Sequence, residues 1–121
     1  MTYESVKVVE SQIAPGVQYT VALMSFTRRL DLMRRVRELA RQVEFVEAGH
    51  GATAKMDGAL LKAEIDRLYV MWGLRQINGL TIDGAAATPE LLSTSGPEGL
   101  FREVLGAVRR ETGITEEERK N

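Results

Sequence analysis

The sequence lacks residue types on which several common kinds of site chemistry depend. It has 121 residues, no Cys and a single His, His50. Without Cys the chain can form neither a disulfide nor a thiolate, and one His leaves no histidine pair for a metal site. Its polar residues also form no recognisable set of nucleophile, base and charge stabiliser. We therefore predict that the protein is not an enzyme and needs no metal or organic cofactor.

Long apolar segments are also missing. No stretch approaches the roughly 18 uninterrupted apolar residues of a membrane span. Residues 1–10 lack the basic and apolar regions of a signal peptide. The formal net charge is −1, so the whole molecule exerts no strong long-range attraction on nucleic acid or anionic lipid. These absences favour a cytoplasmic protein with no membrane segment.

The apolar residues that are present follow the spacing of a small, mostly helical protein. We predict a mainly α fold, in which an N-terminal β-hairpin precedes two long amphipathic helices and two to three shorter C-terminal helices. The chain is long enough for one core and too short for two. We therefore expect a single domain, with the hairpin in residues 1–24, a helical body in 25–112 and a charged, frayed tail in 113–121.

The hairpin is predicted from two β-forming runs separated by a turn. Residues Ser5–Glu10 and Val17–Met24 are rich in β-branched residues, and Ala14-Pro15-Gly16 lies between them. A lone hairpin is marginally stable in water. We therefore expect it to pack on the helices or to pair with another chain, which makes a homo-oligomer through the hairpin one predicted state.

The first long helix is predicted over Phe26–Glu47. Ser25 or Thr27 can cap its start, and Gly49 favours its end. Its apolar residues fall on one face at about 100° per residue. That face comprises Leu32, Met33, Val36, Leu39, Ala40, Val43 and Val46.

A second long helix is predicted to begin near Thr53 or near Asp57 and to run to about Ile77. Its apolar stripe contains Leu61, Ile65, Leu68 and Trp72, with Leu60 and Met71 on the flank. Further along, we expect a short extended segment over residues 80–84, a short helix over Pro89–Ser93 and a helix over Pro97–Thr112. Thr115–Glu118 matches a capping box that would begin the tail.

Arginine on the first helix is the main charge feature. The helix carries Arg28, Arg29, Arg34, Arg35, Arg37 and Arg41. Because Arg34, Arg37 and Arg41 are three and four residues apart, we expect them to share a stripe opposite the apolar face. Such a stripe could contact phosphates or a protein partner. The near-neutral net charge favours a solvated face or a protein contact over nucleic acid, since acidic residues on the same helix balance the arginines.

The other polar residues favour structural roles. His50 lies in a Gly-His-Gly connector with no second His or Cys to complete a metal site, so we expect it in a surface loop. Glu64 and Asp66 are two residues apart in a helix and diverge by about 200°, so we do not expect them to work as a catalytic pair. Trp72 lies on the apolar stripe and is expected in the core. Met71 and Leu74 are our candidate protein interface, should they be exposed.

The C-terminal half resembles a known group of proteins. It contains a Trp-Gly-Leu helix end, an Ile-Asp-Gly turn, a Gly-Pro-Glu helix start and a terminal Glu-Glu-Glu-Arg-Lys-Asn run, in the segments YVMWGLRQINGLTIDG, TPELL and GPEGLFREVLGAVRRETGITEEERKN. In this it looks like small phage and prophage proteins encoded among tail genes, some of which are similar to tail assembly chaperones. The resemblance covers about the last 50 residues. It implies no catalytic residues.

The resemblance implies a non-catalytic assembly or structural protein, tail-associated, acting as a chaperone or as a minor structural subunit. Its partner would then be a phage tail component. It would lie in the host cytoplasm, or in the virion if it is structural. The alternative from the residues is a small nucleic-acid-binding regulator that uses Arg34, Arg37 and Arg41.

Overall fold

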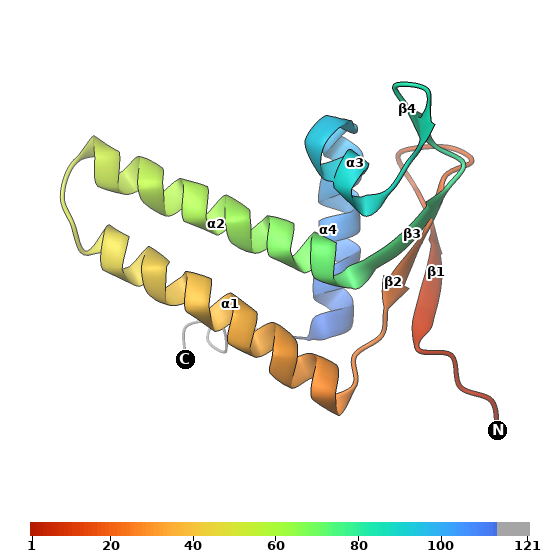
Figure 1. The fold of residues 1–121 in the computed structure, drawn as a ribbon, viewed down its shortest axis with the longest axis horizontal. Helices are drawn as coiled ribbons and strands as arrows, with labels where there is room; N and C mark the ends of the chain where they lie inside the picture. Colours follow the sequence, from red (N-terminus) through yellow and green to blue (C-terminus); the bar gives the residue numbers. More distant parts are fainter. Residues whose placement is uncertain (114–121) are drawn as a thin grey trace.

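A computed structural model describes residues 1–113, which form a small antiparallel sheet packed against helices. The elements in chain order are β1 (Val6–Glu10), β2 (Gln18–Ala22), α1 (Phe26–Glu47), α2 (Ala52–Gly73), β3 (Leu74–Asn78), β4 (Thr81–Ile82), β5 (Ala85–Ala86), α3 (Pro89–Ser95) and α4 (Glu98–Thr112). Figure 1 shows α1 and α2 as an antiparallel pair that projects away from the sheet. The prediction of a mainly helical chain with an N-terminal β-hairpin is confirmed.

The predicted hairpin is part of a larger sheet. β1 and β2 pair antiparallel, and β2 also pairs with β3, which gives the strand order β1-β2-β3. The prediction that the second helix continues to Ile77 is wrong, because the helix ends at Gly73 and the next five residues are a strand. The 25–112 segment is accordingly not purely helical.

A β-bulge explains why the third strand resembles a helix in the sequence. Thr20 pairs with Gln76 but Val21 pairs with Leu74, so Arg75 is an extra residue in β3. In a regular strand, residues three apart point to opposite faces, whereas a bulge shifts the alternation by one. Leu74 and Ile77 are therefore both buried on the same face. Their spacing imitates one turn of a helix.

The two long helices agree well with the sequence pattern. α1 begins and ends where predicted, and the Ser25 side chain caps it by accepting a hydrogen bond from the Arg28 N–H. α2 begins at Ala52, close to the earlier of the two expected starts. The residues of α1 that are buried all belong to its predicted apolar face: Leu32, Val36, Ala40 and Val43.

The remaining elements, β4 to α4, follow β3 in the chain and begin or end at turn and cap residues. β4 and β5 flank an Asp83-Gly84 turn in which both residues have positive φ, the pattern of a tight hairpin turn. Thr88 caps α3, which extends two residues beyond the predicted end. α4 ends at a left-handed Gly113, as predicted. The Thr115–Glu118 capping box and most of the expected tail lie outside the described residues.

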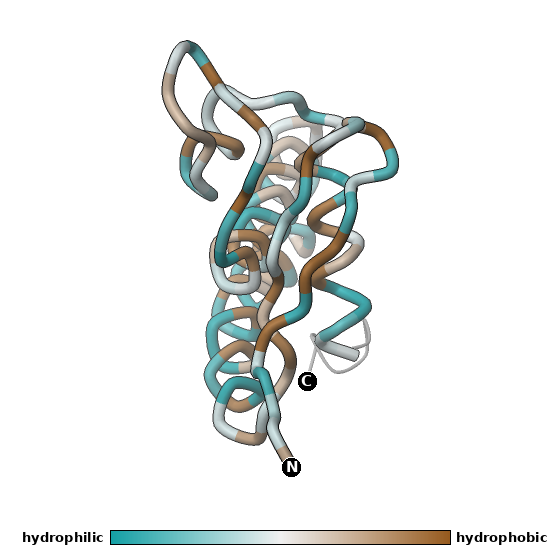
Figure 2. The backbone as a smooth tube through the Cα atoms, turned by 90° about the vertical axis from the view of Figure 1, so that its right-hand side faces the viewer, coloured by the Kyte–Doolittle hydropathy of each residue, from teal (hydrophilic) through white to brown (hydrophobic). Residues whose placement is uncertain are grey.

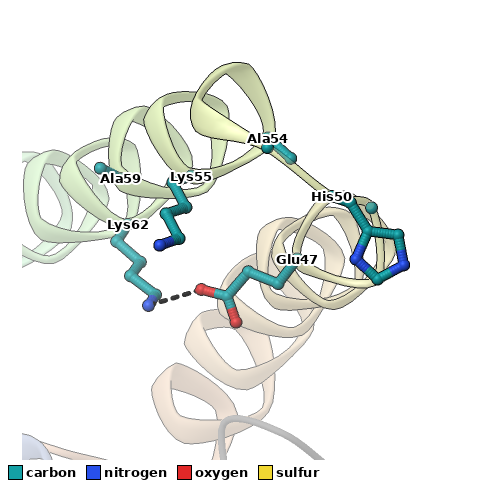
Figure 3. Close-up of a pocket in the computed structure, with 8 residues that line it drawn as sticks. Glu47, His50, Ala54, Lys55, Ala59 and Lys62 are labelled. Carbon is teal, nitrogen blue, oxygen red and sulfur yellow. Dashed lines mark ion pairs between the residues drawn. The ribbon is translucent and has the colours of Figure 1, made fainter.

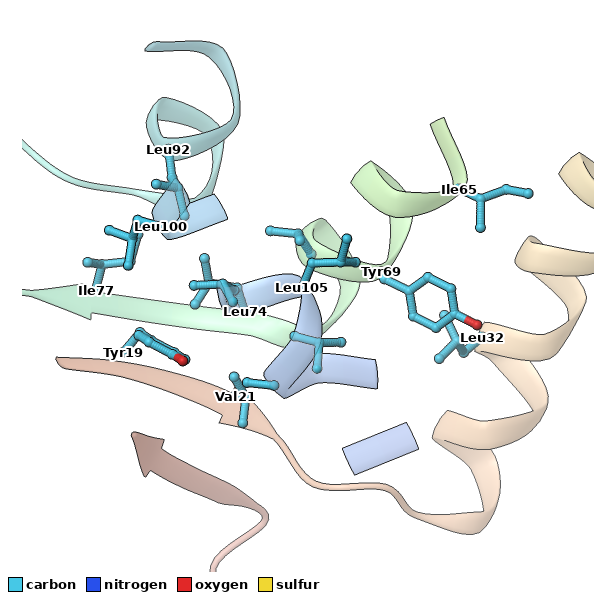
Figure 4. Packing of buried hydrophobic residues seen from close by; sticks show 14 of the residues in the cluster. Tyr19, Val21, Leu32, Ile65, Tyr69, Leu74, Ile77, Leu92, Leu100 and Leu105 are labelled. Carbon is cyan, nitrogen blue, oxygen red and sulfur yellow. The ribbon is translucent and has the colours of Figure 1, made fainter. Parts of the chain in front are cut away.

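One apolar core joins the sheet to the helices. The inner face of β2 contributes Tyr19 and Val21, and β3 contributes Leu74 and Ile77. Figure 4 shows these side chains meeting residues of α2, α3 and α4, while Leu32 and Ile65 extend the cluster between α1 and α2. The other face of the sheet carries Thr20 and Gln76. Figure 2 views the sheet side, where hydrophobic and hydrophilic segments alternate along the chain.

Glu103 of α4 fixes the loop between β1 and β2. Its Oε1 atom accepts hydrogen bonds from the backbone N–H groups of Gln12 (2.8 Å) and Ile13 (3.1 Å) and from the Ser11 hydroxyl (3.3 Å). Its Oε2 atom is buried and has no hydrogen bond of normal geometry among the described residues, although the Tyr19 hydroxyl interacts with the carboxylate.

This contact shifts the acidity of both side chains. Burial raises the pKa of Glu103, but the hydrogen bonds from Gln12, Ile13 and Ser11, together with the interaction with the Tyr19 hydroxyl, outweigh it, and the net pKa is lowered. Burial, followed by the interaction with Glu103, raises the pKa of Tyr19 to about 12. The carboxylate is therefore held in its charged form by the loop.

α2 and α4 approach closely at Gly73. A Cβ atom at this position would lie 2.5 Å from Cγ1 of Val108, so only glycine fits without movement. Asp66 on α2 pairs with Arg109 (2.5 Å) and Arg102 (3.6 Å) on α4, and Arg109 also lies over the Tyr69 ring. These contacts agree with the structural role predicted for Asp66, while Glu64 is exposed.

Candidate protein-interaction site

The structure brings together two candidates that are far apart in the sequence, Arg34 and Met71. Both line a groove of about 530 Å³ between the N-terminal half of α1 and the junction of α2 with β3. We call this the α1–β3 groove. Its lining residues are Thr27, Arg28, Leu30, Asp31, Arg34, Arg35, Met71, Trp72 and Arg75.

The local structure of the two walls determines which side chains reach the groove. α1 and α2 pack antiparallel, so the first turns of α1, which begins after its Ser25 cap, run beside the end of α2. On the other wall α2 stops at Gly73, and the bulge in β3 falls on Arg75. A bulge reorients side chains relative to a regular strand. Arg75 is exposed and lines the groove, although its strand belongs to the sheet.

The groove is positively charged. Its lining contains four arginines and one carboxylate, that of Asp31. Arg28 is committed to the fold, since its guanidinium donates hydrogen bonds of 2.9 Å to the carbonyls of Ser5 and Leu23. Arg35 pairs with Asp31 at 3.2 Å. Arg34 and Arg75 have no ion pair among the residues that the structure describes, so their charges are available to an anionic group.

The groove also has an apolar part. Trp72 packs against the core but is only partly buried, and Met71 is likewise partly buried. The prediction that Trp72 is a core residue is thus correct for its packing, and one side of it contributes to the groove lining. Leu30 adds an aliphatic side chain that is 39% exposed. Apolar and cationic groups therefore lie side by side.

Leu74, the other candidate interface residue, is not at the surface. It is only 3% exposed, because it occupies the inner face of β3 rather than the flank of a helix. The expectation that it contributes to an exposed interface is wrong for this fold. Met71 keeps that role as a prediction.

The other two arginines of the predicted stripe are separate from the groove. Arg37 and Arg41 are exposed on α1, as expected from their spacing, but neither lines the groove. Arg29, by contrast, donates a hydrogen bond to the carbonyl of Thr112 and so ties α1 to the end of α4. The arginines of α1 thus divide into those that hold the fold together and those that face solvent.

His50 lies at the far end of the helix pair. It lines a second open pocket together with Glu47, Lys55 and Lys62, shown in Figure 3. Glu47 and Lys62 form an ion pair of 2.6 Å across α1 and α2. Over residues 1–113 there is no group of three or more His, Cys, Asp or Glu side chains suited to a metal ion. The loop position predicted for His50 is confirmed.

Sequence reasoning missed Arg75 and the exposed side of Trp72. The sequence pattern concealed Arg75 because residues 74–77 were predicted to continue the second helix, whereas the structure places them in the strand Leu74–Asn78. Only the end of the helix at Gly73, a residue unfavourable inside helices, could have suggested the strand.

Comparisons with known proteins add no family. No known family model matches the chain, and no curated protein and no solved structure is similar enough to count as a match. Within residues 1–113, no helix combines the length and the apolar character that crossing a membrane requires. The likeness to tail-gene proteins remains a prediction.

Proposed function

We propose that this protein is a non-catalytic assembly or interaction protein that binds a partner protein in the α1–β3 groove. The observation that supports this is the position of Arg34 and Arg75, without ion pairs among the described residues, beside the partly buried Met71 and Trp72. Protein interfaces commonly combine arginine and aromatic or methionine side chains in this way.

The groove chemistry defines the partner segment. Arginine binds carboxylates in a two-point geometry, so an acidic side chain would pair with Arg34 or Arg75. An apolar side chain next to it would cover Met71 and Trp72. The partner segment is therefore a short acidic and apolar stretch of protein.

The tail-gene resemblance suggests where this segment belongs. We propose a phage or prophage tail component as the partner, with the protein acting as a chaperone or as a minor subunit. A chaperone would leave the finished particle, and a subunit would stay. Probing mature particles for this chain distinguishes the two roles. Flanking tail-tube or tape-measure genes would support the proposal, and a metabolic operon would count against it.

Co-purification of the full chain with candidate tail proteins tests the proposal. We expect capture of at least one of them. Replacing both free arginines of the groove, Arg34→Glu with Arg75→Glu, should weaken binding at least about tenfold. The matched control is Arg37→Glu with Arg41→Glu, which reverses the same number of charges outside the groove. Capture of no tail component by the folded wild type would overturn the proposal.

The same variants test the alternative, a nucleic-acid-binding regulator. Arg34, Arg37 and Arg41 are all exposed on α1, as phosphate contacts would require. Binding of labelled duplex or single strand should then fall steeply with salt, and reversal of Arg37 and Arg41 should weaken it. No shift of either probe at low salt would exclude this function.

A further inference from the structure

The free edge of β1 is an interaction surface of its own. β1 is the first strand in the order β1-β2-β3, so one side of it has no neighbour among the described strands. Unpaired strand edges are templates for pairing with another chain. At the opposite edge, β3 carries the bulge at Arg75, a feature that disturbs regular pairing. β1 is therefore the regular edge of this sheet.

The hydrogen bonds of the hairpin show which groups face that edge. Leu23 donates its N–H to the Ser5 carbonyl, and Ser11 donates its N–H to the Val17 carbonyl. In an antiparallel ladder the residues that bond to one neighbour alternate with those that face the other side. Odd-numbered residues of β1 thus bond to β2. Val6, Val8 and Glu10 direct their N–H and C=O groups outward.

The side chains of β1 leave this edge accessible. Val8 is 60% exposed at the middle of the strand. Lys7, a residue type that often discourages edge pairing, extends to the α4 side and pairs with Glu111 at 3.3 Å. A groove of about 270 Å³ runs along β1 and is also lined by Ala107 and Arg110 of α4.

We propose that the β1 edge binds the β1 edge of a second copy of this chain, antiparallel and centred on Val8. This register places Val8 opposite Val8 of the second copy, and Val6 opposite Glu10. All the outward N–H and C=O groups of the three residues in each copy are then paired. The two sheets become one continuous sheet with both α4 helices on the same face.

A second copy fits this edge, because the strand sequence, VKVVE, pairs with itself in this register without a clash of charge. In the proposed register Lys7 faces Val9 of the second copy, so no like charges are directly opposed. The two central valines bury each other's exposed surface. The inference is independent of the α1–β3 groove, and either can fail without the other.

Sedimentation velocity of the full chain at increasing concentration tests the proposal. We expect a monomer that converts to a dimer over about a hundredfold range of concentration, because the fraction of dimer follows mass action. Val8→Pro should weaken dimerisation at least about tenfold, since it removes the central hydrogen-bond donor of each copy. The hairpin should tolerate this change, because the Val8 N–H does not bond to β2.

Charge variants test the register. Val8→Lys and Val8→Glu should each be monomeric, because like charges would face each other across the two-fold axis. An equimolar mixture of the two should recover the dimer. Gln76→Lys is the matched control, since it places the same charge on the same face of the sheet but at the β3 edge. A wild type that is monomeric throughout, a dimer indifferent to Val8→Pro, or a mixture that fails to associate would each overturn the proposal.

Discussion

Replacing Glu103 by Gln should measurably loosen the contact between α4 and the β1–β2 loop. The carboxylate accepts three hydrogen bonds from Ser11, Gln12 and Ile13. A bond to a charged acceptor contributes about 1.5–3 kcal/mol and a neutral one about 0.5–1.5 kcal/mol. Because the amide oxygen of Gln can still accept bonds, Glu103→Gln should lower the free energy of unfolding by about 1–3 kcal/mol, and Glu103→Ala by more.

Urea unfolding monitored by the fluorescence of Trp72 measures this loss. The control is Glu64→Gln, an exposed carboxylate on α2, for which we expect a change within about 0.5 kcal/mol. Amide exchange at Gln12 and Ile13 should accelerate in Glu103→Gln. Equal stability of Glu103→Gln and the control would refute the idea that this carboxylate holds the loop.

The difference between wild type and Glu103→Gln should also depend on pH. The pKa of Glu103 in the folded protein is lowered from its ordinary value of 4.5. A lowered pKa means that the unfolded chain binds the proton more readily than the folded protein. The stabilisation of the folded state by the charged Glu103 carboxylate is therefore fully present above the ordinary pKa. It should decline as the pH falls from about 4.5 through the lower pKa of the folded state. Urea unfolding at a series of pH values checks this, and a difference that grows on acidification would contradict it.

Two further substitutions test other parts of the fold. Gly73→Ala should lower the free energy of unfolding by about 1–3 kcal/mol, because the added methyl group would collide with Val108, and thermal unfolding that shows a gain would contradict the close approach. Arg28→Ala should cost about 1–3 kcal/mol through its lost bonds to two backbone carbonyls, whereas Arg37→Ala should change stability by less than about 0.5 kcal/mol, and urea unfolding of both variants checks the contrast.

The parts of the fold that local signals determine were predictable from the sequence. α1 could be placed to the residue because Ser25 caps it and its apolar residues keep a helical period. β3 could not be predicted from the sequence, because the bulge places Leu74 and Ile77, which are three residues apart, on the same face, as one turn of a helix would. Only the pairing of this segment with β2, which is distant in the sequence, distinguishes a strand from a continued helix.

The same reason limits the prediction of the candidate site. Arg34 and Met71 were each identified from the sequence, but their meeting in one groove depends on how α1 packs against the end of α2. Arg75 joins them only because its segment is a strand. Leu74 was a candidate interface residue on the condition that it is exposed, and that condition is not met because the strand turns its side chain into the core.

The equal lengths of the two long helices have a consequence for how the sheet assembles. α1 and α2 each have 22 residues, so the chain travels about 33 Å outward and returns by about the same distance. The returning chain therefore reaches β3 beside the strand from which it left. Without the helix pair, joining β2 to β3 would require closing a long flexible loop, at an entropic cost that grows with its length. Early pairing of the helices converts a distant contact in the sequence into a local one, so the folding rate should depend on α1–α2 packing more than on the strands themselves.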